Sequence, residues 1–259
     1  MQSIQDQFVK WQEWIKRIEG DITNRLVLPR RIHRELVEVV NANLDHVTRN
    51  SGQYFVNFVR YGYAAQVAMG IRRHVKSKDD SVSLMRLLKQ VGENARRFTY
   101  KFFLEQFPIR DDYVNWQEPT FRRFSDDMIA VSEPILIDDM QNLKALAKNV
   151  EDMVDKEIAH LDKKPHAVAV TFGDLEKCID ELDGLVCKYR TLFGGGGMST
   201  LEPTILFDWE EILLTGLSTV HLGKEKGSGV FSLLRVLPVC KKTPDPFSFR
   251  RVRTGQMGI

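Results

Sequence analysis

Cysteine is scarce in this sequence, and its spacing excludes two common kinds of site. The 259 residues include three cysteines, Cys178, Cys187 and Cys240, and no two of them form a Cys-x-x-Cys pair. Small disulfide-stabilised folds and structural zinc sites need more cysteines, or closely spaced ones. The sequence therefore predicts neither a disulfide framework nor a zinc site, and it suits a reducing compartment such as the cytoplasm.

Long apolar runs are also missing. No window approaches about 18 uncharged apolar residues, the length that a membrane-spanning helix needs. The opening stretch, MQSIQDQFVKWQEW, carries acidic and polar residues where a signal peptide has its apolar core. With 43% hydrophobic and 28% charged residues, the composition is typical of a soluble globular protein. We expect a cytoplasmic protein that makes no contact with a membrane.

Strong net charge and the usual catalytic signatures are absent too. The formal net charge is +2, so binding to nucleic acid would depend on a local basic patch. The six histidines include no H-E-x-x-H spacing, and there is no G-x-S-x-G nucleophile motif. The four glycines at 194–197 lack the Gly-Lys-Ser/Thr that completes a phosphate loop. No metal, cofactor or hydrolase nucleophile is predicted.

What the sequence does contain is apolar residues at helical spacing over most of its first 193 positions. Steps of three and four residues place side chains on one face of a helix. They predict helices over residues 3–26, 29–49, 53–76, from the capping residues 79–81 to about 107, 120–131, 138–165 and 174–193. The expected fold class is all-α, a helical bundle over residues 1–193 followed by a less regular, partly disordered extension at 194–259.

The helix expected at 53–76 is rich in aromatic residues. It contains Tyr54, Phe55, Phe58, Tyr61 and Tyr63. Core packing is the favoured interpretation, because aromatic side chains bury large areas. The alternative is a surface on which nucleic-acid bases stack, and exposed rings beside arginines would favour it.

The longest apolar stripe lies in the helix expected at 138–165. The break at Ser132-Glu133-Pro134 is expected to precede this helix, and Pro165 to end it. The stripe consists of Met140, Leu143, Ala147, Val150, Val154, Ile158 and Leu161. A polar cluster follows near its end, at Asp155, Lys156, His160 and Asp162. A histidine flanked by a cation and carboxylates suits proton transfer or a phosphate contact.

The run from Asp155 to Asp162, DKEIAHLD, resembles the closing helix of the HEPN superfamily. The AbiU-type, abortive-infection branch has a similar K-x-x-(I/L)-A-H-x-D pattern. A weaker similarity to the same branch lies at Ser83-Leu84-x-x-Leu87-Leu88. The resemblance implies an all-helical fold, a homodimer, and a metal-independent ribonuclease of a phage-defence or toxin–antitoxin system. A nucleotidyltransferase-type antitoxin is the partner that it implies.

The resemblance also implies roles for individual residues. His160 falls on the family histidine and would act as general acid or base on the RNA 2′-hydroxyl. In the family, four to six residues separate the arginine from this histidine, and four intervening residues would place the arginine at Asp155. Lys156 would then stabilise the charge on the phosphorane, and a lysine does this without the bidentate fork of arginine. Asp155 would orient His160, and the ribonuclease would be weak or degenerate.

Local basic clusters supply candidate contacts to RNA. They contain Arg72, Arg73, Arg96, Arg97, Arg122 and Arg123. One interpretation is a track for the RNA backbone that leads to His160. The other is a solvated helix face with ion pairs to nearby acids. A non-catalytic module that binds RNA or protein therefore remains the alternative function.

Overall fold

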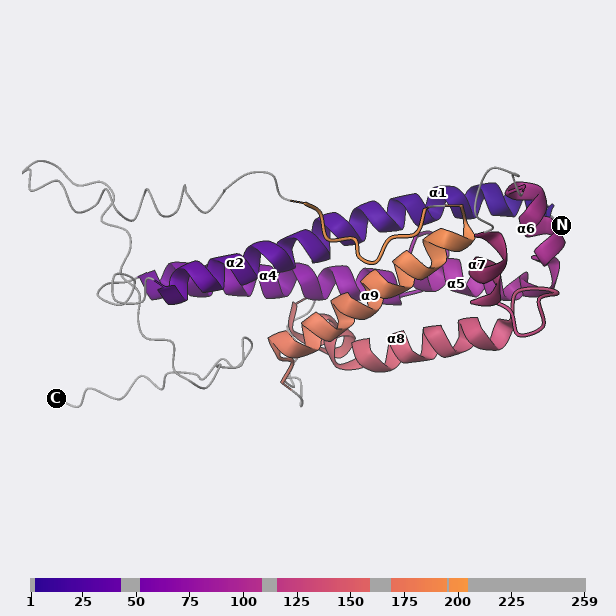
Figure 1. Ribbon diagram of the computed structural model, residues 1–259. Helices are drawn as coiled ribbons and strands as arrows, with labels where there is room; N and C mark the ends of the chain where they lie inside the picture. The colour runs from indigo at the N-terminus through magenta and orange to yellow at the C-terminus, as the bar shows by residue number, and fades with distance from the viewer. Residues whose placement is uncertain (1–2, 43–51, 109–115, 159–168, 195, 205–259) are drawn as a thin grey trace, which may run out of the picture.

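The computed structural model describes residues 3–42, 52–108, 116–158, 169–194 and 196–204 (Figure 1). These residues form helices and short connections, and the described ranges contain one isolated bridge, between Thr99 and Ala130, but no strand. The expected all-α class is therefore confirmed. None of the helices in these ranges combines the length and the apolar character that crossing a membrane requires.

The chain begins with a long helical rod rather than two separate helices. It comprises α1 (Ile4–Ile22), the π turn η1 (Thr23–Val27) and α2 (Leu28–Ala42). The backbone stays right-handed helical at Thr23 and at Leu28, so the rod has no break. Pro29 lacks a backbone donor, and a π turn is one way in which a helix accommodates such a disturbance. Of the predicted helix 29–49, residues 43–49 lie outside the described ranges.

Helix α4 (Gly52–Val75) returns along α2, and the two extend past the ends of α8 and α9 in Figure 1. Tyr63 is buried, as expected. The core-packing interpretation is wrong for the other rings, because Tyr54 is 79% and Phe58 73% exposed, with Phe55 and Tyr61 also exposed. This part of α4 reaches beyond the helices that would cover it.

Residues 84–106 form two helices joined by a 3-10 turn, so the prediction of one helix to residue 107 is wrong. They are α5 (Leu84–Glu93), η2 (Ala95–Arg97) and α6 (Tyr100–Gln106). Ser83 caps α5 by accepting a hydrogen bond from the Arg86 amide, and Thr99 caps α6 in the same way. Two N-caps within one apolar stretch specify two helix starts.

The segment before α8 is mostly turn. Helix α7 (Gln117–Arg122) is shorter than the predicted helix 120–131, and Met128 adopts a left-handed conformation with φ 60°. The Ser132 amide donates to the Phe124 carbonyl at 2.7 Å, which closes this turn. The chain is thereby returned to the point where α8 begins.

Helix α8 (Glu133–Met153) continues into the π turn η3 (Val154–Ile158). It begins five residues earlier than predicted, because Pro134 lies in the first turn, where its missing donor costs nothing. Of the predicted stripe, Leu143, Ala147, Val150 and Val154 are buried, Met140 and Ile158 are partly buried against the core, and Leu161 lies outside the described ranges.

Helix α9 (Phe172–Leu192) packs against α1, α4 and α8. A capping box starts it, in which Thr171 accepts from the Asp174 amide and Asp174 accepts from the Thr171 amide. Its buried positions occur on more than one face, from Leu175 to Leu192. The helix is therefore the centre of the bundle.

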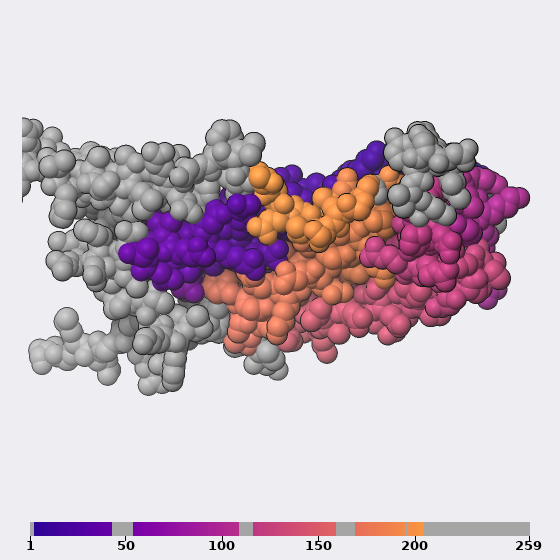
Figure 2. All heavy atoms as spheres, in the orientation of Figure 1, coloured from indigo at the N-terminus to yellow at the C-terminus, as the bar shows by residue number. Residues whose placement is uncertain are grey.

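Residues 196–204 form a strap that crosses α9 toward α2. The buried Asp183 carboxylate of α9 accepts hydrogen bonds from the Thr200 hydroxyl at 2.6 Å and the Leu201 amide at 2.7 Å. Further along, Arg31 of α2 donates to the Pro203 carbonyl at 2.7 Å. Figure 2 shows the orange strap lying against the indigo and violet atoms of the first helices. The first residues of the predicted extension thus pack on the bundle, and 205–259 lie outside the described ranges.

We predict that Gly194→Ala destabilises the fold whereas Gly196→Ala does not. Gly194 has φ +88°, and a Cβ there would lie 2.3 Å from the Phe107 ring. A Cβ on Gly196 would meet no atom within 4 Å. Urea unfolding should show a loss of about 1–3 kcal/mol for Gly194→Ala, and less than about 0.5 kcal/mol for Gly196→Ala. Equal losses in the two variants would contradict this.

Candidate functional site

Two of the three predicted catalytic residues lie where the helix formed by α8 and η3 ends. Asp155 and Lys156 belong to η3, whereas His160 and Asp162 lie outside the described residues. Of the motif, the structure therefore describes only Asp155 and Lys156 and their surroundings. Both described side chains are partly exposed, so this end of the helix reaches the surface.

Asp155 joins η3 to the end of α4. Its carboxylate accepts a hydrogen bond from the Arg72 Nε atom and forms an ion pair with Lys76 at 3.4 Å. Lys76 also pairs with Glu151 of α8 at 3.2 Å. Together with Lys156, these residues place three cations and two acids around one helix end. We call Arg72, Lys76, Glu151 and Asp155 the α4–η3 charge network.

The network shifts the pKa values of Asp155 and Lys76. Partial burial would raise the pKa of Asp155, but the hydrogen bonds and charges of Arg72 and Lys76 outweigh it and lower that pKa. The hydrogen bond to Glu151 is the main cause that raises the pKa of Lys76. Both groups are charged at neutral pH, and the network is a set of true ion pairs.

The structure changes the interpretation of Asp155. Where the resemblance expects an arginine on the helix itself, the aspartate instead binds Arg72 from another helix. The planar guanidinium of Arg72 therefore lies beside position 155, where the family motif would have its own arginine. Sequence spacing could not reveal this, because 83 residues separate the two side chains.

An open hollow of about 710 Å³ adjoins the network, between the end of α4, α5 and α8. Its size is within the range of ligand-binding clefts. Lys76, Lys89 and Lys144 line it, and Met85 and Met140 form part of an apolar floor. The sequence analysis did not predict Lys89 and Lys144 as contacts, because neither has another basic residue directly beside it in the sequence.

The structure divides the six predicted RNA-binding arginines into two groups. Arg72 and Arg73 lie at the end of α4, where Arg72 pairs with Asp155 and Arg73 with Asp21 of α1. The other four lie beside the start of α8, where Val131 bonds to the Phe98 carbonyl and Ser132 to that of Phe124: Arg96, Arg97, Arg122 and Arg123. The 21 residues of α8 span roughly 30 Å at about 1.5 Å per residue. The two groups therefore do not form one short track.

Several of these arginines have acidic or polar partners. Arg73 pairs with Asp21 at 3.0 Å, and Arg122 pairs with Glu118 at 2.6 Å. Arg97 donates to the Asn94 side chain at 3.0 Å. These contacts agree with the interpretation as a solvated, ion-paired face, although an exposed pair can also exchange its partner for a phosphate.

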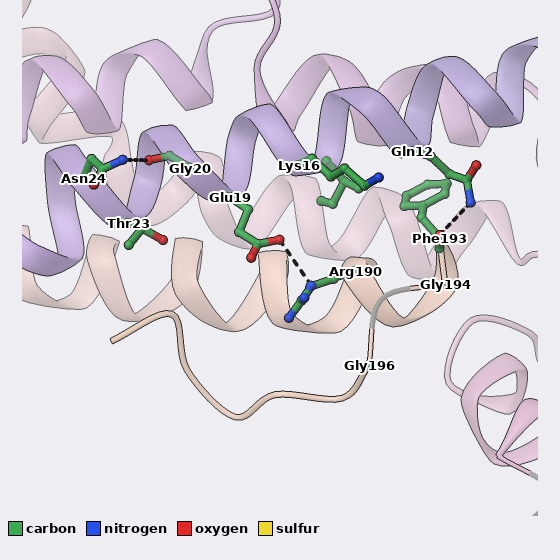
Figure 3. A pocket seen from close by; sticks show the side chains of 11 residues that line it. Gln12, Lys16, Glu19, Gly20, Thr23, Asn24, Arg190, Phe193, Gly194 and Gly196 are labelled. Atoms are coloured by element: carbon green, nitrogen blue, oxygen red, sulfur yellow. Dashed lines mark hydrogen bonds and ion pairs between the residues drawn. The ribbon is translucent and has the colours of Figure 1, made fainter. Parts of the chain in front are cut away.

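A second hollow, of about 650 Å³, lies between the first helical rod and the end of α9 (Figure 3). It contains none of the predicted site residues. Lys16 and Gly196 line it, and Glu19 pairs across it with Arg190 at 3.2 Å. This ion pair ties α1 to α9 at the hollow.

Other kinds of site find no support among the described residues. These ranges contain no cluster of three or more His, Cys, Asp or Glu side chains that could hold a metal ion. Cys178 and Cys187 are buried, and burial is the main cause that raises the pKa of each thiol to about 12. Neither cysteine is suited to act as a nucleophile.

The exposed rings of α4 keep the base-stacking interpretation open. Arg60 lies in the same segment, but its guanidinium is 5.0 Å from the centre of the Phe172 ring at the start of α9. It therefore contributes to packing between helices. The exposed surface of Tyr54 and Phe58 offers area on which bases could stack.

We predict a pH-dependent stability loss for Asp155→Asn. The pKa of Asp155 is lower in the fold than its ordinary value near 3.9, so its stabilising effect is complete above that value. It disappears as the pH falls through the lowered pKa. Because the Asp155 side chain is 38% exposed and its charge is screened by solvent, we expect a loss of about 0.5–1 kcal/mol at pH 7, and a smaller one near pH 2.

Urea unfolding at the two pH values measures this difference, with Asp152→Asn on the same helix as the matched control. The control should change stability little at either pH. A loss for Asp155→Asn that is the same at pH 7 and pH 2 would show that the carboxylate charge has no part in it.

Comparison of the chain with protein-family models, with curated proteins and with solved structures found no match in any of the three. The similarity to the HEPN superfamily therefore depends on the run Asp155–Asp162 and on the weaker match from Ser83 to Leu88.

Proposed function

We propose that this chain is a HEPN-like protein of a phage-defence or toxin–antitoxin system that binds RNA and cleaves it without a metal ion. The observation that supports the proposal is the lysine-lined hollow beside the α4–η3 charge network. It offers an open, cationic surface next to the helix end that carries the predicted motif. An RNA backbone needs such a surface to reach His160.

The lysines of the hollow are suited to phosphate contacts. Lys144 is exposed on α8, and the pair between Lys89 and Glu93 is long, at 4.0 Å, with both side chains largely exposed. Such cations remain available for an RNA phosphate. The methionine floor can accommodate the apolar faces of sugars and bases.

The cleavage step would use two kinds of group. His160 would take the proton from the 2′-hydroxyl or give one to the leaving oxygen, because imidazole titrates near neutral pH. Lys156 and Arg72 would stabilise the negative charge that develops on the phosphorane. Asp155 holds the Arg72 guanidinium in place by their hydrogen bond. Its charge also offsets that of Arg72, which is consistent with a weak ribonuclease.

The second candidate is a non-catalytic module that binds RNA or protein. The ion pairs of Arg72, Arg73 and Arg122 favour it, since acids already satisfy these predicted contacts. The two candidates differ at one residue: cleavage requires His160, whereas binding does not.

We predict that binding and cleavage separate by residue. Lys89→Gln combined with Lys144→Gln should weaken binding to single-stranded RNA and reduce the salt slope by about 0.7 per lost contact. His160→Ala should bind normally but cleave about 10²–10⁴-fold more slowly. Titrations at several salt concentrations measure the first effect, and cleavage of a mixed RNA with chelator present measures the second.

Lys148→Gln is the matched control, because Lys148 lies one turn from Lys144 on α8 and is not part of the hollow. If the control weakens binding as much as the lysine pair, the hollow is not the RNA surface. If the natural protein binds RNA but neither it nor His160→Ala cleaves, the protein is the binding module instead.

We also propose that the protein forms a homodimer through α8 and binds a nucleotidyltransferase-type antitoxin, as the resemblance implies. Leu146 of α8 is 40% exposed, so this helix presents an apolar side chain that a second copy could cover. Sedimentation at micromolar concentration should show twice the chain mass of 29.9 kDa. Leu146→Lys should shift the protein toward monomer, with Lys148→Gln as control. A natural protein that sediments as a monomer would rule the dimer out.

A further inference from the structure

The first half of α4 carries an exposed aromatic surface that none of the preceding proposals uses. Tyr54 and Phe58 are largely exposed, and Phe55 and Tyr61 are 44% and 41% exposed. Successive residues of a helix are about 100° apart, so these four rings lie within about 120° of one another around α4. We call Tyr54, Phe55, Phe58 and Tyr61 the α4 aromatic surface.

The size of this surface indicates that something covers it. Each aromatic side chain has about 150–250 Å² of surface, so the four exposed fractions together leave roughly 500 Å² in contact with solvent. The largest apolar patch on a typical monomer is about 300–600 Å², and patches of this size often mark a site of interaction.

The residues around the surface favour an apolar occupant. Residues 52–59 of α4 include no charged side chain. Arg60 comes next, and its guanidinium lies over the Phe172 ring at the start of α9. A single-stranded nucleic acid needs cations along its backbone as well as rings for its bases. A protein segment rich in apolar side chains needs only the rings.

The strap brings the chain to this part of the molecule. Arg31 of α2 donates to the Pro203 carbonyl of the strap. Two residues further along α2, the His33 ring stacks on Tyr63 of α4, with ring centres 4.1 Å apart. Thr204, the last described residue, therefore lies beside α2 at about the level of Tyr63.

The aromatic surface is within reach of the residues that follow Thr204. Phe58 precedes Tyr63 by five residues and Tyr54 precedes it by nine, which is about 7.5 Å and about 13.5 Å along the helix. An extended chain covers about 3.3 Å per residue, so ten residues span up to about 33 Å. Residues 205–214 are therefore long enough to cover all four rings.

The composition of residues 205–214 suits this surface. They read ILFDWEEILL, in which seven of the ten side chains are apolar and two of these, Phe207 and Trp209, are aromatic. The stretches 43–51 and 159–168, which follow α2 and η3, contain no Phe, Tyr or Trp. A segment tethered beside its site also has an effective concentration on the order of millimolar, so a modest affinity is enough to hold it there.

We propose that residues 205–214 dock on the α4 aromatic surface, with Phe207 and Trp209 in contact with Tyr54 and Phe58. The proposal is independent of the RNA surface and of the dimer through α8, because this part of α4 extends past α8 (Figure 1). A second copy of the chain or an RNA would be a different occupant, and the experiment below distinguishes all three.

Photo-cross-linking in the full chain tests the proposal. A p-benzoylphenylalanine placed at position 58 bonds on irradiation to whatever lies against it, and mass spectrometry of the digest identifies the linked peptide. The linked peptide should contain residues 205–214. A second probe at position 54 should give the same result, and both positions are exposed, so neither probe disturbs the core.

Phe207→Asp combined with Trp209→Asp should lower the yield of this cross-link about tenfold or more, because the two changes remove large apolar side chains from the contact. Asp208→Asn combined with Glu210→Gln is the matched control. It makes the same number of changes in the same segment, keeps every apolar side chain, and should leave the yield unchanged.

A probe at position 129 controls for random collisions. Ile129 is 67% exposed in the turn that precedes α8, far from the α4 aromatic surface. It should not link to residues 205–214. Equal yields from positions 58 and 129, or equal losses in the two double variants, would overturn the proposal.

Mixing isotope-labelled with unlabelled chains shows whether the link forms within one chain. Links between two isotopically different chains would identify a second copy as the occupant and overturn the proposal. Links from position 58 to added single-stranded RNA in place of residues 205–214, or no link to any peptide, would overturn it as well.

Discussion

The burial of α9 against α1, α4 and α8 is the constraint on which the rest of the structure depends. Leu175, Ile179, Leu182 and Val186 are removed from solvent in the middle of the bundle. Each such side chain contributes about 1.5–3 kcal/mol on burial, so the helix supplies a large share of the driving force. The strap that follows is held to α9 by Asp183. With α1, α4 and α8 held in this way, their polar ends meet.

The end of α4 is the most important of these meeting points. Successive residues of a helix are about 100° apart, so neighbours in sequence face different helices. Arg72 reaches η3, while Arg73 and His74 reach Asp21 of α1. One short basic run is thereby divided between two clusters with different neighbours. One cluster adjoins an open lysine-lined hollow, and the other joins Arg73 and the buried His74 to Asp21 of α1.

Helical periodicity predicted most of the elements because burial of one face is a local pattern. The predicted stripe shows this, since Leu143, Ala147, Val150 and Val154 are buried, and Met140 and Ile158 are partly buried against the core. Boundaries were harder to predict, because several residues have two opposite uses. Pro134 can end a helix or begin one, and here it lies in the first turn of α8. Ser83 and Thr99 each cap a helix, which divided one predicted helix in two. Tyr54 and Phe58 are exposed because α4 extends past α8 and α9, and the spacing of the aromatic residues along α4 does not reveal how long those helices are.

The sequence by itself determined the all-α class, the apolar faces, and the residues that could carry acid–base or phosphate chemistry, because these properties depend on composition and on spacing along the chain. Only the tertiary structure decided which of those residues meet. The partner of Asp155 is 83 residues away, and that of His74 is 53 residues away. It also placed Arg96, Arg97, Arg122 and Arg123 at the opposite end of α8 from Asp155. The physical reason is that charge pairing acts through space over a few ångströms, whereas sequence patterns report only which residues share a helix face.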